Sequence, residues 1–171
     1  MKYKVGIALA VAAVAGFSVV GPGQAANDDL RNKYPNGTQS AEDCTLDGDT
    51  LTYYGPAKMW PPNHKLQDIL FEATSSTGGP VDLAVTPQVT DVAGGDGGPR
   101  HDPDVVYSGD APAASGTGSA ELPMQLRSER SGKGDGRTYT LDAVATYDMV
   151  RTCSMQVVVA VPHDMRGGAD W

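Results

Sequence analysis

Apolar and polar side chains alternate along most of the chain from residue 46 onward. The clearest run is Tyr139 to Tyr147, in which every second residue is aromatic or aliphatic and the residues between them are mostly threonine or aspartate. A period of two residues places one set of side chains on each face of an extended chain. This run therefore predicts a β-strand with one buried face and one solvent-facing side.

Other segments show the same period. They are 46–54, 66–74, 81–92, 104–108, 122–126 and 153–161, and Gly or Pro marks many of the boundaries between them. Glycine-rich stretches at 93–103 and 109–119 and a charged turn at 128–136 are expected to be loops. No segment has a convincing helical period. About seven strands joined by frequent turns predict an all-β fold, an antiparallel β-sandwich.

The first 26 residues have the pattern of a secretory signal peptide. Lys2 and Lys4 precede an almost wholly apolar stretch from 5 to 20, and small residues follow at the expected cleavage site, after Ala25 or Ala26. The apolar stretch is shorter than the ~20 residues that a spanning helix needs. We therefore expect a secreted, extracellular protein that has no membrane anchor after cleavage.

The remaining chain is expected to form one domain. The polar segment 27–45 is interpreted as a flexible N-terminal arm, 46–164 as the sandwich domain, and 165–171 as a flexible tail. The formal charge of the whole chain is −8. Removing the two lysines of the signal segment would make it −10, from 11 basic and 21 acidic residues. This acidity argues against binding to nucleic acids or anionic membrane surfaces.

Cys44 and Cys153 are the only two cysteines in the sequence. In an exported protein, two cysteines most often form one disulfide, and no CxxC spacing favours a metal site. We therefore predict a Cys44–Cys153 bridge.

Three motifs resemble a known class of domain. They are WPPNHK at 60–65, ERSGKGDGRTY at 129–139 and VPHD at 161–164. In this order they resemble an immunoglobulin-like module, related to HYR and fibronectin type III domains, of secreted and surface bacterial proteins. Tyr139 at the start of its strand is also similar to the tyrosine corner of immunoglobulin-like sandwiches. The resemblance implies an extracellular β-sandwich with a structural or adhesive role and no catalytic residues.

Strict alternation of seven strands would bring four loops to one end of the sandwich. That end would gather polar residues from all four, namely Asn63, His64, Asp96, His101, Asp102, Asp104, Glu129, Arg130, Asp135, Arg137, His163 and Asp164. Arg130 and Arg137 could pair there with neighbouring carboxylates such as Glu129, Asp135 or Asp164. Such a network would hold long loops that have no hydrophobic core of their own.

Two metal sites are alternatives at the same end. Asp96, Asp102 and Asp104, with loop carbonyl oxygens, could supply the oxygen ligands that Ca²⁺ prefers. His64, His101 and His163 could bind zinc with one open position and so permit hydrolysis, although no zinc-binding spacing is present.

The sequence therefore predicts a non-catalytic module that binds an extracellular protein or cell-wall partner and needs no cofactor. A calcium-stabilised binding module is the alternative, and a metal-dependent hydrolase ranks last.

Overall fold

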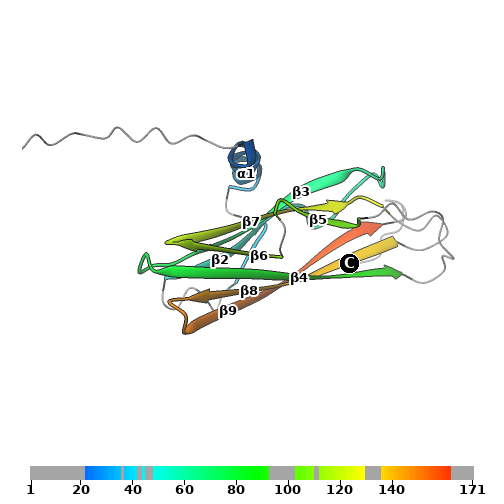
Figure 1. Ribbon diagram of the computed structural model, residues 1–171. Coiled ribbons are helices and arrows are strands. Elements are labelled where there is room, and N and C mark those ends of the chain that lie inside the picture. Colours follow the sequence, from blue (N-terminus) through cyan, green and yellow to red (C-terminus); the bar gives the residue numbers. More distant parts are fainter. Residues whose placement is uncertain are drawn as a thin grey trace, which may run out of the picture.

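The computed structural model describes residues 22–35, 37–41, 44, 48–92, 103–109, 112–129 and 136–162. Two antiparallel sheets pack face to face (Figure 1). One has the strand order β1-β2-β3-β7-β5 and the other β6-β4-β8-β9. The all-β sandwich predicted from the alternating pattern is confirmed. None of the described residues belongs to a helix that is long and apolar enough to cross a bilayer.

The strands of the five-stranded sheet are β1 (Gln39–Ser40), β2 (Thr50–Tyr54), β3 (Leu66–Thr74), β7 (Ser119–Arg127) and β5 (Val105–Tyr107). Those of the four-stranded sheet are β6 (Ala113–Thr117), β4 (Pro80–Val92), β8 (Gly136–Tyr147) and β9 (Arg151–Pro162). Their inward positions are the alternating apolar residues of the sequence, and they are buried as predicted. The core includes Leu51, Tyr53, Ile69, Phe71, Leu83, Met124, Leu126, Tyr139, Leu141, Tyr147, Val157 and Val159.

The described residues form nine strands, not the seven expected. Neither β1 nor β6 was predicted, and β6 lies inside the stretch 109–119 that was expected to be a loop. The sequence of β6, AASGT, has no large apolar residue that could produce an alternating pattern. It is a strand because it pairs with the first part of β4, with Ser115 opposite Asp82.

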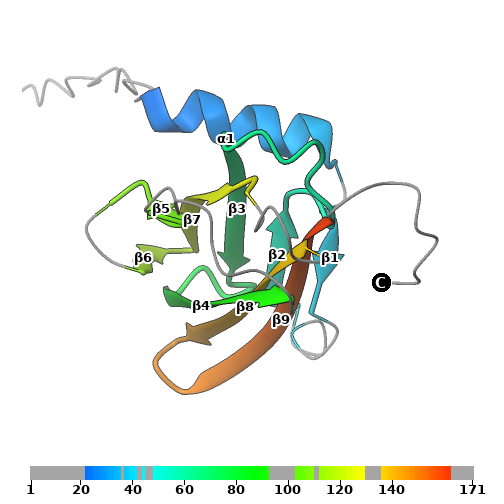
Figure 2. The same cartoon turned by 90° about the vertical axis from the view of Figure 1, so that its right-hand side faces the viewer.

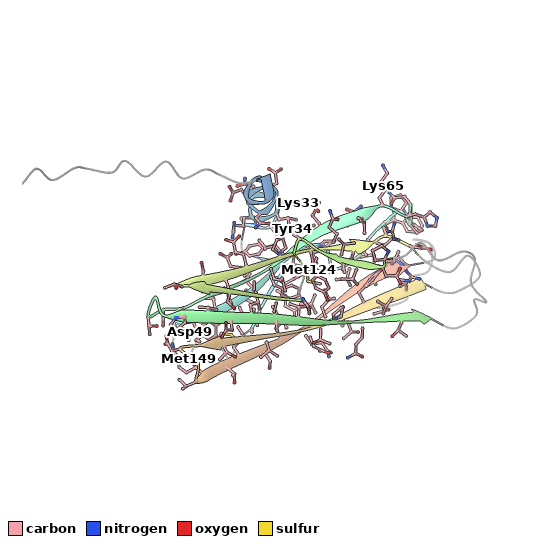
Figure 3. The ribbon with its side chains drawn as sticks, viewed as in Figure 1. Lys33, Tyr34, Asp49, Lys65, Met124 and Met149 are labelled. Carbon is pink, nitrogen blue, oxygen red and sulfur yellow. A yellow bond between two sulfur atoms is a disulfide. The ribbon has the colours of Figure 1, made fainter. Side chains whose placement is uncertain are left out.

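The two additional strands leave the loops at one end of the sandwich. Strands β7 and β4 both end at this end of the sandwich. Because β5 pairs antiparallel with β7 and β6 pairs antiparallel with β4, β5 and β6 run in the same direction and together cross the fold once. At that end β3 begins, β4 and β7 end, β8 begins and β9 ends. We call it the loop pole; it lies at the right of Figure 1, and Figure 3 labels Lys65 beside it, with Asp49 and Met149 at the opposite end.

The predicted disulfide joins two distant parts of the chain. Cys44 lies between β1 and β2, and Cys153 is an inward residue of β9, with 109 residues of separation in sequence and 5.5 Å between the two Cα atoms. Both cysteines belong to the buried core. The bridge therefore joins the segment between β1 and β2 of the five-stranded sheet to β9, an edge strand of the four-stranded sheet.

One helix corrects the expectation of a loose arm. Residues Pro22–Lys33 form α1, which lies on the outer side of the five-stranded sheet (Figure 2). Glu72 of β3 and Glu121 of β7 stand directly opposite each other on that sheet. Arg31 of α1 forms an ion pair with each, at 3.2 Å to Glu72 and 2.5 Å to Glu121. Like charges at opposite positions destabilise a strand pair, so Arg31 offsets that repulsion and holds the helix in place.

A buried leucine on α1 and another on β3 are consistent with the docking of the helix. Leu30 of the helix is buried. Leu70 of β3 is also fully buried, although it is absent from the core cluster between the sheets and lies on the same strand face as Glu72. A helix with one buried leucine has little apolar periodicity, and this is why the sequence pattern did not reveal it.

Candidate functional site

Five of the twelve predicted pole residues lie in the described structure, and all five are at the loop pole. They are Asn63, His64, Asp104, Glu129 and Arg137. The other seven, Asp96, His101, Asp102, Arg130, Asp135, His163 and Asp164, lie outside the described residues. The described five belong to a network of ion pairs and backbone hydrogen bonds.

Arg137 provides the buried part of this network. It is the second residue of β8, and its Nη1 donates to Asp104 Oδ1 at 2.5 Å. Its side chain is only 1% exposed and that of Asp104 is 16% exposed. The calcium hypothesis included Asp104 as a ligand, and Arg137 was expected to pair with Glu129, Asp135 or Asp164. The structure instead joins these two residues across the start of β5 and the start of β8.

Arg127, the last residue of β7, was not predicted to take part. Its Nε donates to the carbonyl of Pro103 at 3.1 Å, and its Nη1 donates to the carbonyl of His64 at 2.9 Å. The same Nε lies 4.0 Å from Glu129 Oε2. The guanidinium group has several donors in one plane, so a single arginine can hold two loops. Its place at the end of a strand, beside the polar turn, was the sequence signal available.

Ser128 completes the attachment of the WPPNHK corner. Its N–H donates to Lys65 O at 2.8 Å, its carbonyl accepts from His64 N at 2.9 Å, and its hydroxyl donates to Pro61 O at 2.9 Å. Within the corner, the side chain of Asn63 accepts from the backbone N–H of Lys65 at 3.1 Å. These four hydrogen bonds, together with the one that Arg127 donates to His64, hold a six-residue corner that contains two prolines.

The corner has an unusual backbone. The Trp60–Pro61 peptide bond is cis, and His64 has a φ of 61°. A positive φ is uncommon for a residue other than glycine, and surrounding contacts must maintain it. Here the N–H and the carbonyl of His64 are both bonded, to Ser128 and Arg127 respectively.

Trp60 and His64 are the two exposed aromatic side chains of this fixed corner. Trp60 retains 45% of its accessible surface and the side chain of His64 retains 52%. The Nδ1 of His64 lies 3.7 Å from Oε2 of Glu129, whose own side chain is buried. The corner thus presents an indole and an imidazole to solvent above a buried carboxylate.

Tyr139 links the pole to the core. Its hydroxyl donates to Arg127 O at 2.7 Å, which is the kind of bond that defines the tyrosine corner of immunoglobulin-like sandwiches. Burial raises the pKa of the Tyr139 phenol, while neighbouring Arg137 acts in the opposite direction. The hydroxyl therefore remains a donor to the carbonyl of the residue that holds the corner.

The buried tyrosines predict a loss of stability in alkali. Burial raises the pKa of Tyr53 and Tyr139, and that of Tyr147 to about 12, from the ordinary value of 10.0. Below pH 10 both folded and unfolded chains keep these protons, so this stabilisation is fully present. As the pH rises from 10 towards 12, the unfolded chain loses them first and stability falls. The urea midpoint should therefore decrease across this range and less so in Tyr147→Phe; an unchanged midpoint would contradict the expectation.

Only some of the proposed metal ligands lie among the described residues. Among the described residues, no group of three or more His, Cys, Asp or Glu side chains is close enough to hold a metal ion. Asp104 has its Oδ1 engaged by Arg137. Asp96 and Asp102 of the calcium hypothesis, and His101 and His163 of the zinc hypothesis, lie outside the described residues. Both sites therefore stay predictions.

A cavity of about 280 Å³ lies away from the pole, where the chain passes from β5 to β6. Its lining residues are Ser108, Gly109, Ala113, Ala114, Glu121, Leu122 and Pro123. The carboxylate of Glu121, the one charged group among them, is bonded to Asn27 and Arg31 of α1. The described residues of this lining do not bring catalytic groups together, so the WPPNHK corner is the stronger candidate for function.

Comparison of the chain with family models, with curated proteins and with solved structures found no match. The resemblance to immunoglobulin-like bacterial modules therefore stays a prediction.

Proposed function

We propose that the protein is an exported, non-catalytic β-sandwich domain that binds an extracellular protein or cell-wall partner through the WPPNHK corner. The observation that carries this proposal is the combination of exposure and rigidity at the corner. Trp60 and His64 face solvent, while Arg127 and Ser128 hold the backbone beneath them. The corner is therefore already ordered before a partner binds. Because of this, binding costs less conformational entropy.

The chemistry of the corner fits a protein-like or polymeric partner. Tryptophan is enriched among the residues that dominate binding energy, because it buries a large rigid surface and retains one hydrogen-bond donor. The acidic charge of the chain disfavours nucleic acids and anionic lipids. The signal pattern of residues 1–26 and the Cys44–Cys153 bridge support a location outside the cell.

Trp60→Ala should reduce binding to the partner about 30-fold or more, the loss typical of a dominant interface residue. The matched control is Met149→Ala, which removes a 77% exposed apolar side chain from the opposite end of the sandwich. Binding would be measured by sedimentation with isolated bacterial cell walls and by surface capture on a panel of extracellular proteins. Both variants should keep the parent melting temperature. Equal losses in the two variants, or no loss in Trp60→Ala, would argue against the corner.

Calcium binding at the same pole is the alternative, because Asp104 is located there together with the neighbouring loop ends. If calcium binds only the folded chain, a hundredfold excess over Kd should add about 2.7 kcal/mol of stability, which a chelator removes. Asp102→Ala should abolish this increase, whereas Asp68→Ala, an exposed aspartate of β3, should not. Identical melting curves with calcium and with chelator would contradict the calcium hypothesis and would not affect the corner proposal.

A further inference from the structure

The helix α1 could begin at either of two positions in its sequence. The helix begins at Pro22, but the segment NDDLRNK from Asn27 to Lys33 has the features of a helix start and end of its own. Asparagine is among the best N-cap residues. Asp28 and Asp29 would then occupy the first turn, where the helix dipole favours acids, and the basic Arg31 and Lys33 lie in the last turn. In the helix as it stands, these acids lie in the middle.

Asn27 also has an unsatisfied buried atom. Its side chain is buried, and its Nδ2 donates to Glu121 Oε2 at 2.8 Å. Its Oδ1 has no hydrogen-bond partner. In a helix interior, each backbone N–H already bonds to the carbonyl four residues earlier, so no nearby N–H is free to reach this oxygen. A buried acceptor without a partner is costly, and it calls for an explanation.

Three of the described side chains of α1 connect the helix to the sheet or are buried against it. They are those of Asn27, of the buried Leu30, and of Arg31 with its two glutamates. A helix that starts at Asn27 would keep all three of these contacts.

We propose that cleavage between Ala25 and Ala26 restarts α1 at Asn27, whose Oδ1 then accepts the backbone N–H of Asp29 or Leu30. This rests on the proposed export. Gly23 and Ala25 are the small residues that an export protease requires at the third and first positions before the cut. Hydrolysis breaks the Ala25–Ala26 amide bond, and water supplies the hydroxyl of the Ala25 carboxyl group and a hydrogen to the Ala26 nitrogen.

Removing residue 25 and those before it takes away the carbonyl that the N–H of Asp29 uses in the longer helix. The same cut makes Asn27 an N-cap, the position from which its oxygen can reach the second or third N–H. The new ammonium group at Ala26 interacts unfavourably with the positive end of the helix dipole, and the carboxylates of Asp28 and Asp29 offset this interaction. One cleavage thus gives the unpartnered oxygen a donor and gives one of the N–H groups at the new helix start an acceptor.

The test compares two chain forms. One is the product that an exporting bacterium processes from the full sequence, and the other begins at Pro22; the core, from Ala41 to Val161, is common to both. In the processed form, Asn27→Ala should lower the melting temperature by about 2–4 °C and Asn27→Ser should largely restore it, because serine also caps helices. In the form beginning at Pro22, serine should be no better than alanine.

Amide hydrogen exchange provides a second measurement. In the processed form, Asn27→Ala should speed exchange at Asp29 or Leu30 roughly fivefold, and Asn27→Ser should not. The same effect of Asn27→Ala on both chain forms would overturn the cap. Intact mass tests the cut itself. A secreted product that begins elsewhere than Ala26 overturns the proposed site alone, whereas a full-length, unprocessed chain overturns export as well.

Discussion

Replacing Arg137 with methionine should reduce the free energy of unfolding by about 3–5 kcal/mol, the usual effect of removing one member of a buried ion pair. Methionine keeps much of the side-chain volume, so the loss comes mainly from the Asp104 carboxylate, which would stay largely buried without its bonded cation. The measurement is urea unfolding of the purified variant and its parent at neutral pH.

Two further variants separate this effect from a general loss of charge. Lys65→Met removes a positive charge from an exposed residue at the same pole and should change stability by less than about 0.5 kcal/mol. Arg137→Met combined with Asp104→Asn should recover part of the loss, because the carboxylate is then neutral. If the double variant is as unstable as Arg137→Met alone, packing around Arg137 accounts for the effect, and the ion pair does not.

Replacing Cys44 and Cys153 together with alanine should cost about 4–5 kcal/mol. The bridge closes a loop across 109 residues of sequence, and the chain-entropy model assigns a value of this size to a loop of about 100 residues. Much of the effect arises in the unfolded chain, which becomes free to expand, so the dependence of stability on urea should also become steeper.

A reductant distinguishes loss of the bridge from damage to the core. In reductant, the free energy of unfolding of the parent protein should approach that of the double alanine variant. Reductant should not change the free energy of unfolding of the variant itself. A parent whose stability in reductant stays within 1 kcal/mol of its oxidised value would show that the 109-residue closure contributes little to stability.

Strand positions were predictable because their cause is local. The boundaries expected for 66–74 are those of β3, and the inward faces of β2, β7, β8 and β9 are the apolar positions read from the sequence. Each of these strands has one face in the core, so its own side chains report the burial. An edge strand such as β6 does not need large apolar side chains that alternate along the sequence. Its small residues are extended because β4 lies beside them.

The polar contacts were less predictable because their partners are distant in sequence. Arg31 docks α1 through glutamates 41 and 90 residues away, and Arg137 reaches Asp104 over 33 residues. A list of charged loop residues shows which groups could pair, but many pairings are equivalent at that level. Arg127 was missed for the same reason, since its partners are mainly backbone carbonyls of other loops.

The sequence by itself determined the all-β sandwich, the buried face of each long strand and the pairing of the two cysteines. Alternation of apolar residues specifies which side of a strand leaves water, and two cysteines allow only one intramolecular bridge. Only the tertiary structure decided that Arg137 belongs to Asp104, that a polar helix docks on two opposed glutamates, and that the WPPNHK corner is pinned by Arg127 and Ser128. These depend on the crossing of the chain between the sheets and on strand register, which place groups from separate segments within a hydrogen-bond length of one another.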